Sequence, residues 1–271
     1  MRLLDTSTST LTLKEFKAYQ IPPYAILSHR WGDEELTFQD LDRIDEFIQQ
    51  TSGYKKVKRA ELSEAINSMF AWYQNAGICY AYLDDVVQEG GSGIIPDGVG
   101  NSKFRLYAEL RESKWFTRWW TLQELIAPRV LLMLNVDWVD IGYKRDLCYI
   151  LHSVTGIDET MLRGTAKLES FSIAKRMSWA ADRQTTRPED IAYSLMGIFN
   201  VNLPLIYGEG DNAFLRLQEE IIRNSDDHSI FAWEETRFRS TTQAAFSHVH
   251  QQISSSRPIS FLLRCRACRS T

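Results

Sequence analysis

The sequence predicts an α/β protein in which a parallel β-sheet region is followed by a helical region. Three short apolar runs, each bounded by proline or polar residues, are typical of strands buried on both faces. An amphipathic helical segment separates the first two runs, which is the strand–helix–strand order of a parallel sheet. Beyond Gly142 the apolar spacing becomes helical.

The composition indicates a globular protein with an uneven charge distribution. The chain has 271 residues, of which 44% are hydrophobic and 24% charged, and a formal net charge of −4. These fractions exclude a collagen-like or wholly disordered chain. Residues 236–271 contain six Arg and no Asp or Glu, so the preceding 235 residues carry −10 and this tail carries +6. We expect the tail to be a disordered basic arm without a dedicated nucleic-acid site.

The predicted strands follow one another along the first half of the chain. They cover residues 24–28, 78–83 and 130–134, and the last turns through residues 135–137 into a further segment at 138–141. Between the first two strands, residues 62–73 place apolar side chains on one continuous helix face. A glycine-rich stretch at 90–100 lacks the spacing of a phosphate loop. We expect it to be a surface loop with no helix directly behind it.

Helices are predicted over the rest of the chain. The aromatic-rich segment 115–127 is expected to form one helix that ends at Pro128. Apolar spacing predicts further helices over 173–180, 188–199 and 214–221, with Pro188 in the first turn of the second.

Several kinds of chemistry are excluded by missing motifs. The chain has no G-x-S-x-G motif, and its five His residues are not at ligand spacing with Cys or acidic residues, so we expect no metal. The N-terminus lacks the apolar core of a signal peptide, and the longest uncharged apolar stretch, 193–208, is too short to span a bilayer. We therefore expect a soluble cytoplasmic protein.

Two groups of residues are candidates for a functional site. Ser28, His29, Arg30 and Trp31 follow the first predicted strand, at the sheet edge where open α/β sheets bind ligands. Hydroxyl, imidazole, guanidinium and indole groups there would suit a nucleotide-like ligand. The second group lies in the aromatic-rich segment, where a partly desolvated Glu124 would have a raised pKa. Alternatively, the tryptophans are core residues and the carboxylate belongs to a solvated face or a salt bridge.

The longer motifs resemble the fungal heterokaryon-incompatibility (HET) domain. These motifs are Y-A-I-L-S-H-R-W-G at 24–32, A-E-L-S-E-A-I-N-S-M at 60–69 and R-W-W-T-L-Q-E-L at 118–125. The segments 180–187, 207–210 and 229–233 resemble the region that commonly follows this domain. The resemblance covers most of residues 1–235. It implies a division into a HET domain at 1–142, a helical extension at 143–235 and the tail at 236–271.

The resemblance also implies a fold and a function. HET domains act in fungal nonself recognition and programmed cell death, and they look distantly like TIR domains, which have a flavodoxin-like parallel sheet. The W-T-L-Q-E-L run resembles the TIR motif W-C-x-x-E-L, whose Glu is catalytic in the TIR domains that cleave NAD. Carried over to this sequence, the catalytic residue is Glu124 and the motif Trp is Trp120. Residues 28–31 would then lie next to the nucleotide.

The sequence departs from the HET pattern in two places. The strand that usually carries W-x-D-x-x-C-I-D is absent, because residues 53–58 run directly into the A-E-L-S-E-A-I helix. Since that strand is an edge strand of the flavodoxin-like sheet, its loss would expose strand one as a new edge. In addition, Trp119 stands where the family often has a small residue, and its indole would fill space that a ligand needs.

These observations predict a HET-domain protein of fungal incompatibility signalling that acts through protein partners or self-association. One alternative is an NAD glycohydrolase with Glu124 as its catalytic carboxylate and NAD as substrate, without a bound cofactor. A second alternative is a degenerate, inactive copy, which the missing strand and the unfamiliar tail would explain.

Overall fold

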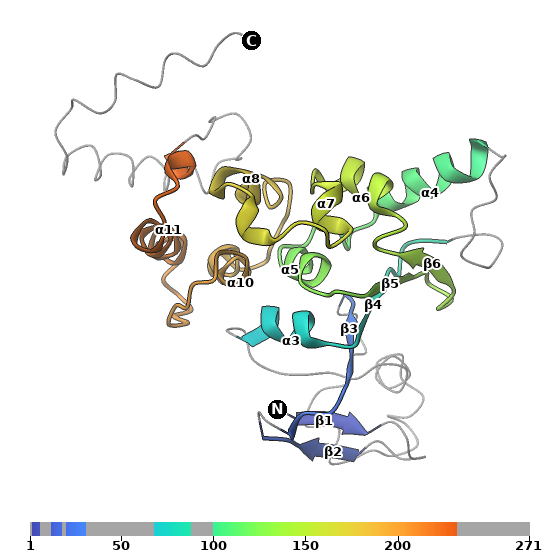
Figure 1. Cartoon of the computed structure of the whole chain (residues 1–271), viewed down its shortest axis with the longest axis horizontal. Helices are drawn as coiled ribbons and strands as arrows, with labels where there is room; N and C mark the ends of the chain where they lie inside the picture. Colours follow the sequence, from blue (N-terminus) through green and yellow to red (C-terminus); the bar gives the residue numbers. More distant parts are fainter. Residues whose placement is uncertain (1, 6–11, 18–19, 31–67, 88–99, 232–271) are drawn as a thin grey trace, which may run out of the picture.

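The computed structural model describes residues 2–5, 12–17, 20–30, 68–87 and 100–231. Two sheets are present in this part of the chain. Strands β1 (Arg2–Asp5) and β2 (Thr12–Glu15) form an antiparallel hairpin that the sequence analysis did not predict. Figure 1 shows this hairpin below the central sheet, with the helices of the C-terminal half on the other side.

The central sheet has the order β3-β4-β5-β6. Strands β3 (Ala25–Ser28), β4 (Ile78–Tyr82) and β5 (Leu131–Leu134) are parallel, which confirms the three predicted strands. Strand β6 (Asp140–Tyr143) pairs antiparallel with β5, so the sheet is mixed and the prediction of a parallel sheet holds for three of its four strands. Among the described residues β3 lies at one edge. The region of the absent strand, 53–61, is outside them, so that prediction stays untested.

The two faces of the sheet have different surroundings because strand side chains alternate in direction. Ile26, Cys79 and Met133 face the main core, which also contains most of the helices. Leu27 and Tyr82 lie on the opposite face in a smaller cluster that Trp138 covers in part. The Trp138 ring stacks on Tyr82 at 4.6 Å between ring centroids.

The loop between β4 and β5 corrects two predictions. Helix α4 (Gly100–Glu112) begins at the last residue of the glycine-rich stretch, so a helix does open directly behind it. The helix predicted over 115–127 is present only as α5 (Thr121–Ile126). The turn before α5 is held by tertiary contacts: the Asp85 carboxylate accepts hydrogen bonds from the Ser113 hydroxyl and the Lys114 amide. Arg118 pairs with Gln184 in a short parallel bridge. Main-chain groups used in this way are not free to extend a helix.

The C-terminal end of α5 is closed by a buried lysine. The Lys144 ammonium donates hydrogen bonds to the carbonyls of Leu125 at 3.0 Å and Pro128 at 2.6 Å. Helices leave their last carbonyls without intrahelical partners, and a cation at this end also interacts favourably with the helix dipole. Lys144 therefore anchors α5 to the end of β6.

Beyond Gly142 the chain is helical, as predicted. The elements are α6 (Cys148–Thr155), α7 (Glu159–Leu162), η4 (Leu168–Ser170), α8 (Ile173–Ser178), α9 (Pro188–Tyr193), α10 (Met196–Phe199), α11 (Asn212–Asn224) and η5 (His228–Phe231). The helix predicted over 188–199 is divided into α9 and α10 by residues 194–195. Residue Asn200, with a left-handed φ of 53°, ends α10.

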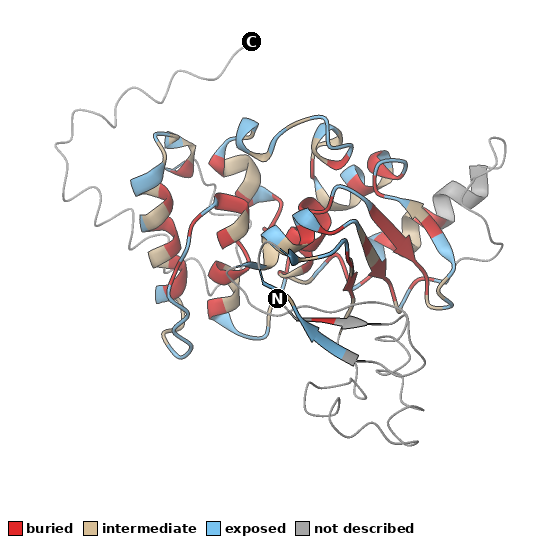
Figure 2. Cartoon of the chain, turned by 60° about the horizontal axis from the view of Figure 1, so that its bottom comes forward, coloured by how far each residue is buried: buried red, intermediate tan, exposed pale blue. Residues whose placement is uncertain are grey.

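One continuous core joins the sheet to these helices. It extends from Leu3 in β1 to Ile230 in η5. Helix α3 (Met69–Asn75), the described part of the helix predicted over 62–73, contacts both α5 and α10. Figure 2 shows buried residues running through the central strands and along the inner sides of the helices. The boundary that we predict near residue 142 therefore lies within a shared core, and the division into domains stays a prediction.

A buried carboxylate fixes the turn before α11. Glu189, in the first turn of α9, accepts hydrogen bonds from the amides of Gly208 at 2.8 Å and Gly210 at 3.0 Å. The backbone amides of Glu189 itself, Gly210 and Gly208 lower the pKa of this carboxyl. A carboxyl whose pKa is lower in the folded state stabilises the fold above its unfolded pKa of about 4.3. That stabilisation is lost as the pH falls through the folded pKa.

We therefore predict that Glu189→Gln removes an acid-sensitive contribution to stability. The wild-type chain should be more stable than Glu189→Gln at pH 7, and this advantage should shrink below about pH 4.3. Urea denaturation at a series of pH values measures the effect. Glu219→Gln, at an exposed position of α11, is the control and should show no such pH-dependent difference. A constant gap between wild type and Glu189→Gln would contradict the prediction.

None of the helices in the described residues is long and apolar enough to cross a membrane. The predicted basic tail, 236–271, lies outside the described residues.

Candidate functional site

The structure brings together two of the predicted site residues, Ser28 and Glu124. Ser28 is the last residue of β3 and lies two positions after Ile26, so its side chain points to the main core face where α5 packs. Glu124 is in the middle of α5 and is 7% exposed. The Ser28 hydroxyl donates a hydrogen bond to Oε2 of Glu124.

Ser28 also links Glu124 to a buried tryptophan. Nε1 of Trp115 donates a hydrogen bond to the Ser28 hydroxyl oxygen at 2.8 Å. Trp115 is fully buried, and its ring meets Phe116 edge to face at 5.0 Å between centroids. The hydroxyl of Ser28 thus accepts from the indole and donates to the carboxylate. A buried side chain that uses both hydrogen-bonding capacities has one well-defined orientation.

The charge on Glu124 is controlled by burial and by its neighbours. Burial raises the pKa of the Glu124 carboxyl, and the Ser28 hydrogen bond acts in the opposite direction. The positive charges of His29, Arg118 and Arg183 also lower this pKa, in that order of effect. The result is a pKa above the ordinary value for Glu.

Two further titratable groups lie close to this carboxylate. Burial raises the pKa of the Tyr73 hydroxyl in α3, and the charge of Glu124 and a hydrogen bond with it add to that effect. Burial also raises the pKa of the Cys79 thiol in β4, again with a contribution from Glu124. Tyr73 is therefore a neutral hydrogen-bonding group beside the carboxylate.

The remaining predicted residues are divided between this cluster and its surroundings. His29 is half-buried, and Trp120 is a half-buried residue directly before α5 that packs on the core. Trp31 lies outside the described residues. Arg30 forms an ion pair with Asp84, with 3.3 Å between nitrogen and oxygen, and lies 4.0 Å from Asp85. Since these acids follow β4, Arg30 joins the loops after two neighbouring strands.

Trp119 is a core residue in the structure. It is 4% exposed, and its amide donates a hydrogen bond to the Gln184 carbonyl at 3.2 Å. Its indole contributes to the main core beneath α5.

Several residues of the Glu124 surroundings were not predicted as site residues, among them Tyr73, Trp115 and Arg183. The sequence analysis assigned the first to a helix face, the second to an aromatic helix and the third to a motif of the extension. The Arg183 guanidinium donates through NH1 to the Arg118 carbonyl at 2.8 Å and to the Thr121 hydroxyl at 2.9 Å. Burial lowers the pKa of Arg183 to about 9, against the effect of Glu124. The sequence contains one indication of Arg183, because this residue lies in the A-A-D-R-Q-T-T-R motif at 180–187.

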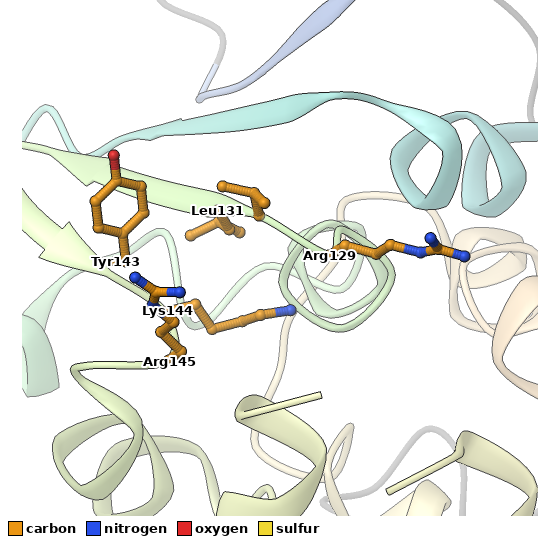
Figure 3. A pocket seen from close by; sticks show the side chains of 6 residues that line it. Arg129, Leu131, Tyr143, Lys144 and Arg145 are labelled. Carbon is orange, nitrogen blue, oxygen red and sulfur yellow. The ribbon is translucent and has the colours of Figure 1, made fainter. Parts of the chain in front are cut away.

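A separate small cavity lies at the opposite edge of the sheet. Its volume is about 250 Å³, and it is lined by Arg129, Val130, Leu131, Tyr143, Lys144 and Arg145. Figure 3 shows the side chain of Arg129 extending away from Tyr143 and Arg145, so the charged groups do not converge on one point. Lys144 is engaged with the carbonyls after α5.

No group of three or more His, Cys, Asp or Glu side chains in the described part of the chain could hold a metal ion. The side chains that meet at the Glu124 cluster are its carboxylate, the hydroxyls of Ser28 and Tyr73 and the thiol of Cys79. A desolvated carboxylate among fixed donors can orient a hydroxyl group or stabilise a developing positive charge.

Comparisons with known proteins relate the chain to fungal incompatibility. It is 41% identical to the vegetative incompatibility protein HET-E-1 of Podospora anserina over an alignment of 251 residues, which covers 82% of this chain. The chain spans only 18% of the length of that protein. A family described as a domain of unknown function (DUF8212) matches residues 212–267, across the predicted boundary at 235. No solved structure matches. The chain is thus similar to part of an incompatibility protein, and its likeness to TIR domains stays a prediction.

Proposed function

We propose that this chain is the HET-type signalling part of a fungal nonself-recognition system that triggers cell death in the cytoplasm when incompatible cells fuse. The observation that carries the proposal is the 41% identity with a vegetative incompatibility protein over 82% of the chain. The motifs of the sequence that resemble HET domains include the two segments that meet in the structure, the end of β3 and α5.

Inducible expression of the chain in a filamentous fungus tests this proposal. We expect induced hyphal cells to die, as measured by uptake of a vital dye, while cells carrying an empty vector survive. A folded and accumulated chain that leaves the cells alive would contradict the proposal. Separate measurement of protein level excludes the possibility that the chain is simply not made.

An NAD glycohydrolase activity is the second candidate, favoured by the contact between Ser28 and the buried Glu124 carboxylate. In that reaction the bond between ribose C1′ and the nicotinamide nitrogen breaks, and nicotinamide leaves with the bonding electron pair. The Glu124 carboxylate would stabilise the oxocarbenium-like ribose. Water then attacks C1′ and loses a proton, which gives ADP-ribose. A ribose hydroxyl could replace the Ser28 hydroxyl as a donor to the carboxylate.

We predict that Glu124→Gln abolishes nicotinamide release. Gln keeps the shape of the side chain but loses the charge that would stabilise the oxocarbenium-like state, so we expect a loss on the order of 100-fold or more. The purified chain is incubated with NAD, and nicotinamide is followed by chromatography. Release by the wild type that is no greater than release by Glu124→Gln would contradict an enzymatic function for this chain.

The same variant separates the proposed functions in cells. Cell death that survives Glu124→Gln would favour a module that acts by protein contacts or self-association. Absence of both death and nicotinamide release would favour a degenerate copy. Sequencing of the transcript across residues 55–61 and around Thr236 then decides whether the missing strand and the tail belong to the message.

A further inference from the structure

Arg183 reaches the candidate site from the helical region. It lies in the connection between α8 and α9, which is 59 positions after Glu124 in the sequence. Its side chain is 7% exposed and runs to the amino-terminal end of α5. The candidate site, as predicted from the sequence, is confined to residues before 143 and does not include it.

The contacts of the Arg183 guanidinium are with neutral groups. NH1 donates to the Arg118 carbonyl and to the Thr121 hydroxyl, and Nε donates to the Trp179 carbonyl at 3.2 Å. NH2 is buried and has no hydrogen-bond partner among the described residues. These contacts fix the position of the guanidinium without neutralising its charge.

The compensating negative charge comes from Glu124. Thr121, the acceptor for NH1, is the first residue of α5, and Glu124 follows it by three positions, about one helical turn. Glu124 is the carboxylate whose charge favours the protonated form of Arg183, and Arg183 in turn favours ionised Glu124. Two buried opposite charges depend on each other in this way because water does not screen them.

We propose that Arg183 is a positioning residue for Glu124: it holds the first turn of α5 through the Thr121 hydroxyl and the main chain of Arg118, and so places the carboxylate one turn further along beside Ser28. The catalytic consequence of this role rests on the proposed glycohydrolase function. The positioning role itself does not depend on enzymatic activity and can be tested in the folded chain alone.

Charged and polar groups from five segments face Glu124. They are Ser28 of β3, His29 after it, Tyr73 of α3, Cys79 of β4, Arg118 before α5 and Arg183. The cations among these groups are His29, Arg118 and Arg183. The first two are half-buried, whereas Arg183 is buried. Arg183 has the smallest effect of the three on the pKa of Glu124, but it is the cation that binds the Thr121 hydroxyl in the first turn of α5.

Carboxyl NMR of the full chain labelled at Glu tests the proposal. The Glu124 resonance is assigned from its absence in Glu124→Gln and is followed during a pH titration. In Arg183→Gln we expect the pKa of Glu124 to rise, since removal of an opposite charge disfavours the carboxylate and the first turn of α5 loses its anchor. Arg183→Lys, which keeps the charge, should remain closer to the wild type.

Arg176→Gln is the matched control. Arg176 is half-buried, donates to the Ile198 carbonyl at 3.0 Å and lies over the Phe199 ring at 4.8 Å, and its charge interacts with Asp227 and Glu169 and not with Glu124. The Arg176→Gln variant should be less stable than the wild type, but the pKa of Glu124 should stay unchanged. An unchanged titration in folded Arg183→Gln, or an equal shift in Arg176→Gln, would overturn the proposal.

Thr121→Val is a second variant in case Arg183→Gln does not fold. It removes the hydroxyl that accepts from the guanidinium but keeps the volume of the side chain. We expect the pKa of Glu124 to rise in this variant too, and an unchanged value would overturn the positioning role. Nicotinamide release by the wild-type chain is measured separately. If the pKa of Glu124 shifts in the variants but the wild type releases no nicotinamide, the positioning role is supported and the glycohydrolase function is contradicted. If the wild type releases nicotinamide but the pKa does not shift, the glycohydrolase function is supported and the positioning role is contradicted.

Discussion

Gly197→Ala is expected to destabilise the chain severely. A Cβ at this position of α10 would lie 2.2 Å from Cβ and 2.7 Å from Cγ of Phe70 in α3. Cβ of Phe70 is attached directly to the α3 backbone, so a rotation of the side chain cannot relieve the contact. The two helices would have to move apart, and the main core between them would be disturbed.

We expect a loss of about 3 kcal/mol, the upper part of the usual range for overpacked cores. A loss of this size is a large fraction of a typical unfolding free energy of about 5–15 kcal/mol. Urea denaturation measures it. Gly77→Ala is the matched control, because its Cβ would meet the Tyr24 carbonyl at an ordinary 3.5 Å. Equal stability of Gly197→Ala and the wild type would contradict the close packing of α3 on α10.

Trp115→Ala is expected to have a comparable effect. The indole is fully buried between the sheet and α5, so its removal leaves a large cavity and a Ser28 hydroxyl without its donor. Replacement of a buried Trp by Ala costs about 3–5 kcal/mol. We expect a loss in this range, measured by thermal or urea denaturation. A loss below about 1 kcal/mol would show that the indole is not buried as described.

Trp115→Phe separates the packing of the indole from its hydrogen bond. Phe keeps most of the aromatic volume but cannot donate to Ser28, so we expect a smaller loss of about 1–2 kcal/mol. Ser28→Ala removes the other partner. In the double variant Trp115→Phe/Ser28→Ala, the combined loss should be less than the sum of the two single losses, because both variants remove the same hydrogen bond. Additive losses would mean that Nε1 and the Ser28 hydroxyl do not interact.

The strands and the longer helices could be predicted because their sequence patterns are local. The four residues of β5 are all buried, as the continuous apolar run predicts. Helix α11 buries Phe214, Leu217 and Ile221, which lie three and four positions apart. In such elements one face or both faces contact the core, and the spacing of apolar residues records this directly.

The start of α5 could not be predicted in this way. The aromatic residues before it come in two adjacent pairs, at 115–116 and 119–120, and this spacing does not distinguish a helix from a buried turn. The turn is fixed by Asp85 and by Gln184, which are distant in the sequence. Contacts of this kind leave no local periodicity.

The candidate site could be predicted in part for a related reason. Ser28 was found because the carboxyl end of a parallel strand is a known place for ligands. Its partner in the structure, Glu124, was found as a carboxylate in the aromatic-rich segment, and the resemblance to a family motif added the catalytic role. Arg183 was not found because its contribution depends on a helical region folding back on α5, and neither charge pattern nor spacing indicates that approach.

The Phe70–Gly197 contact and the Arg183–Thr121 hydrogen bond both cross the boundary near residue 142. These two contacts limit where recombination can join two copies of the gene. A recombination event at that point, between two diverged copies of this gene, would join halves whose opposing surfaces had not changed together. A bulkier residue at 197 that one parent tolerates because residue 70 has changed with it would clash with Phe70 in the recombinant. The surfaces of α3 and α5 and the helical segments that contact them are therefore expected to change together.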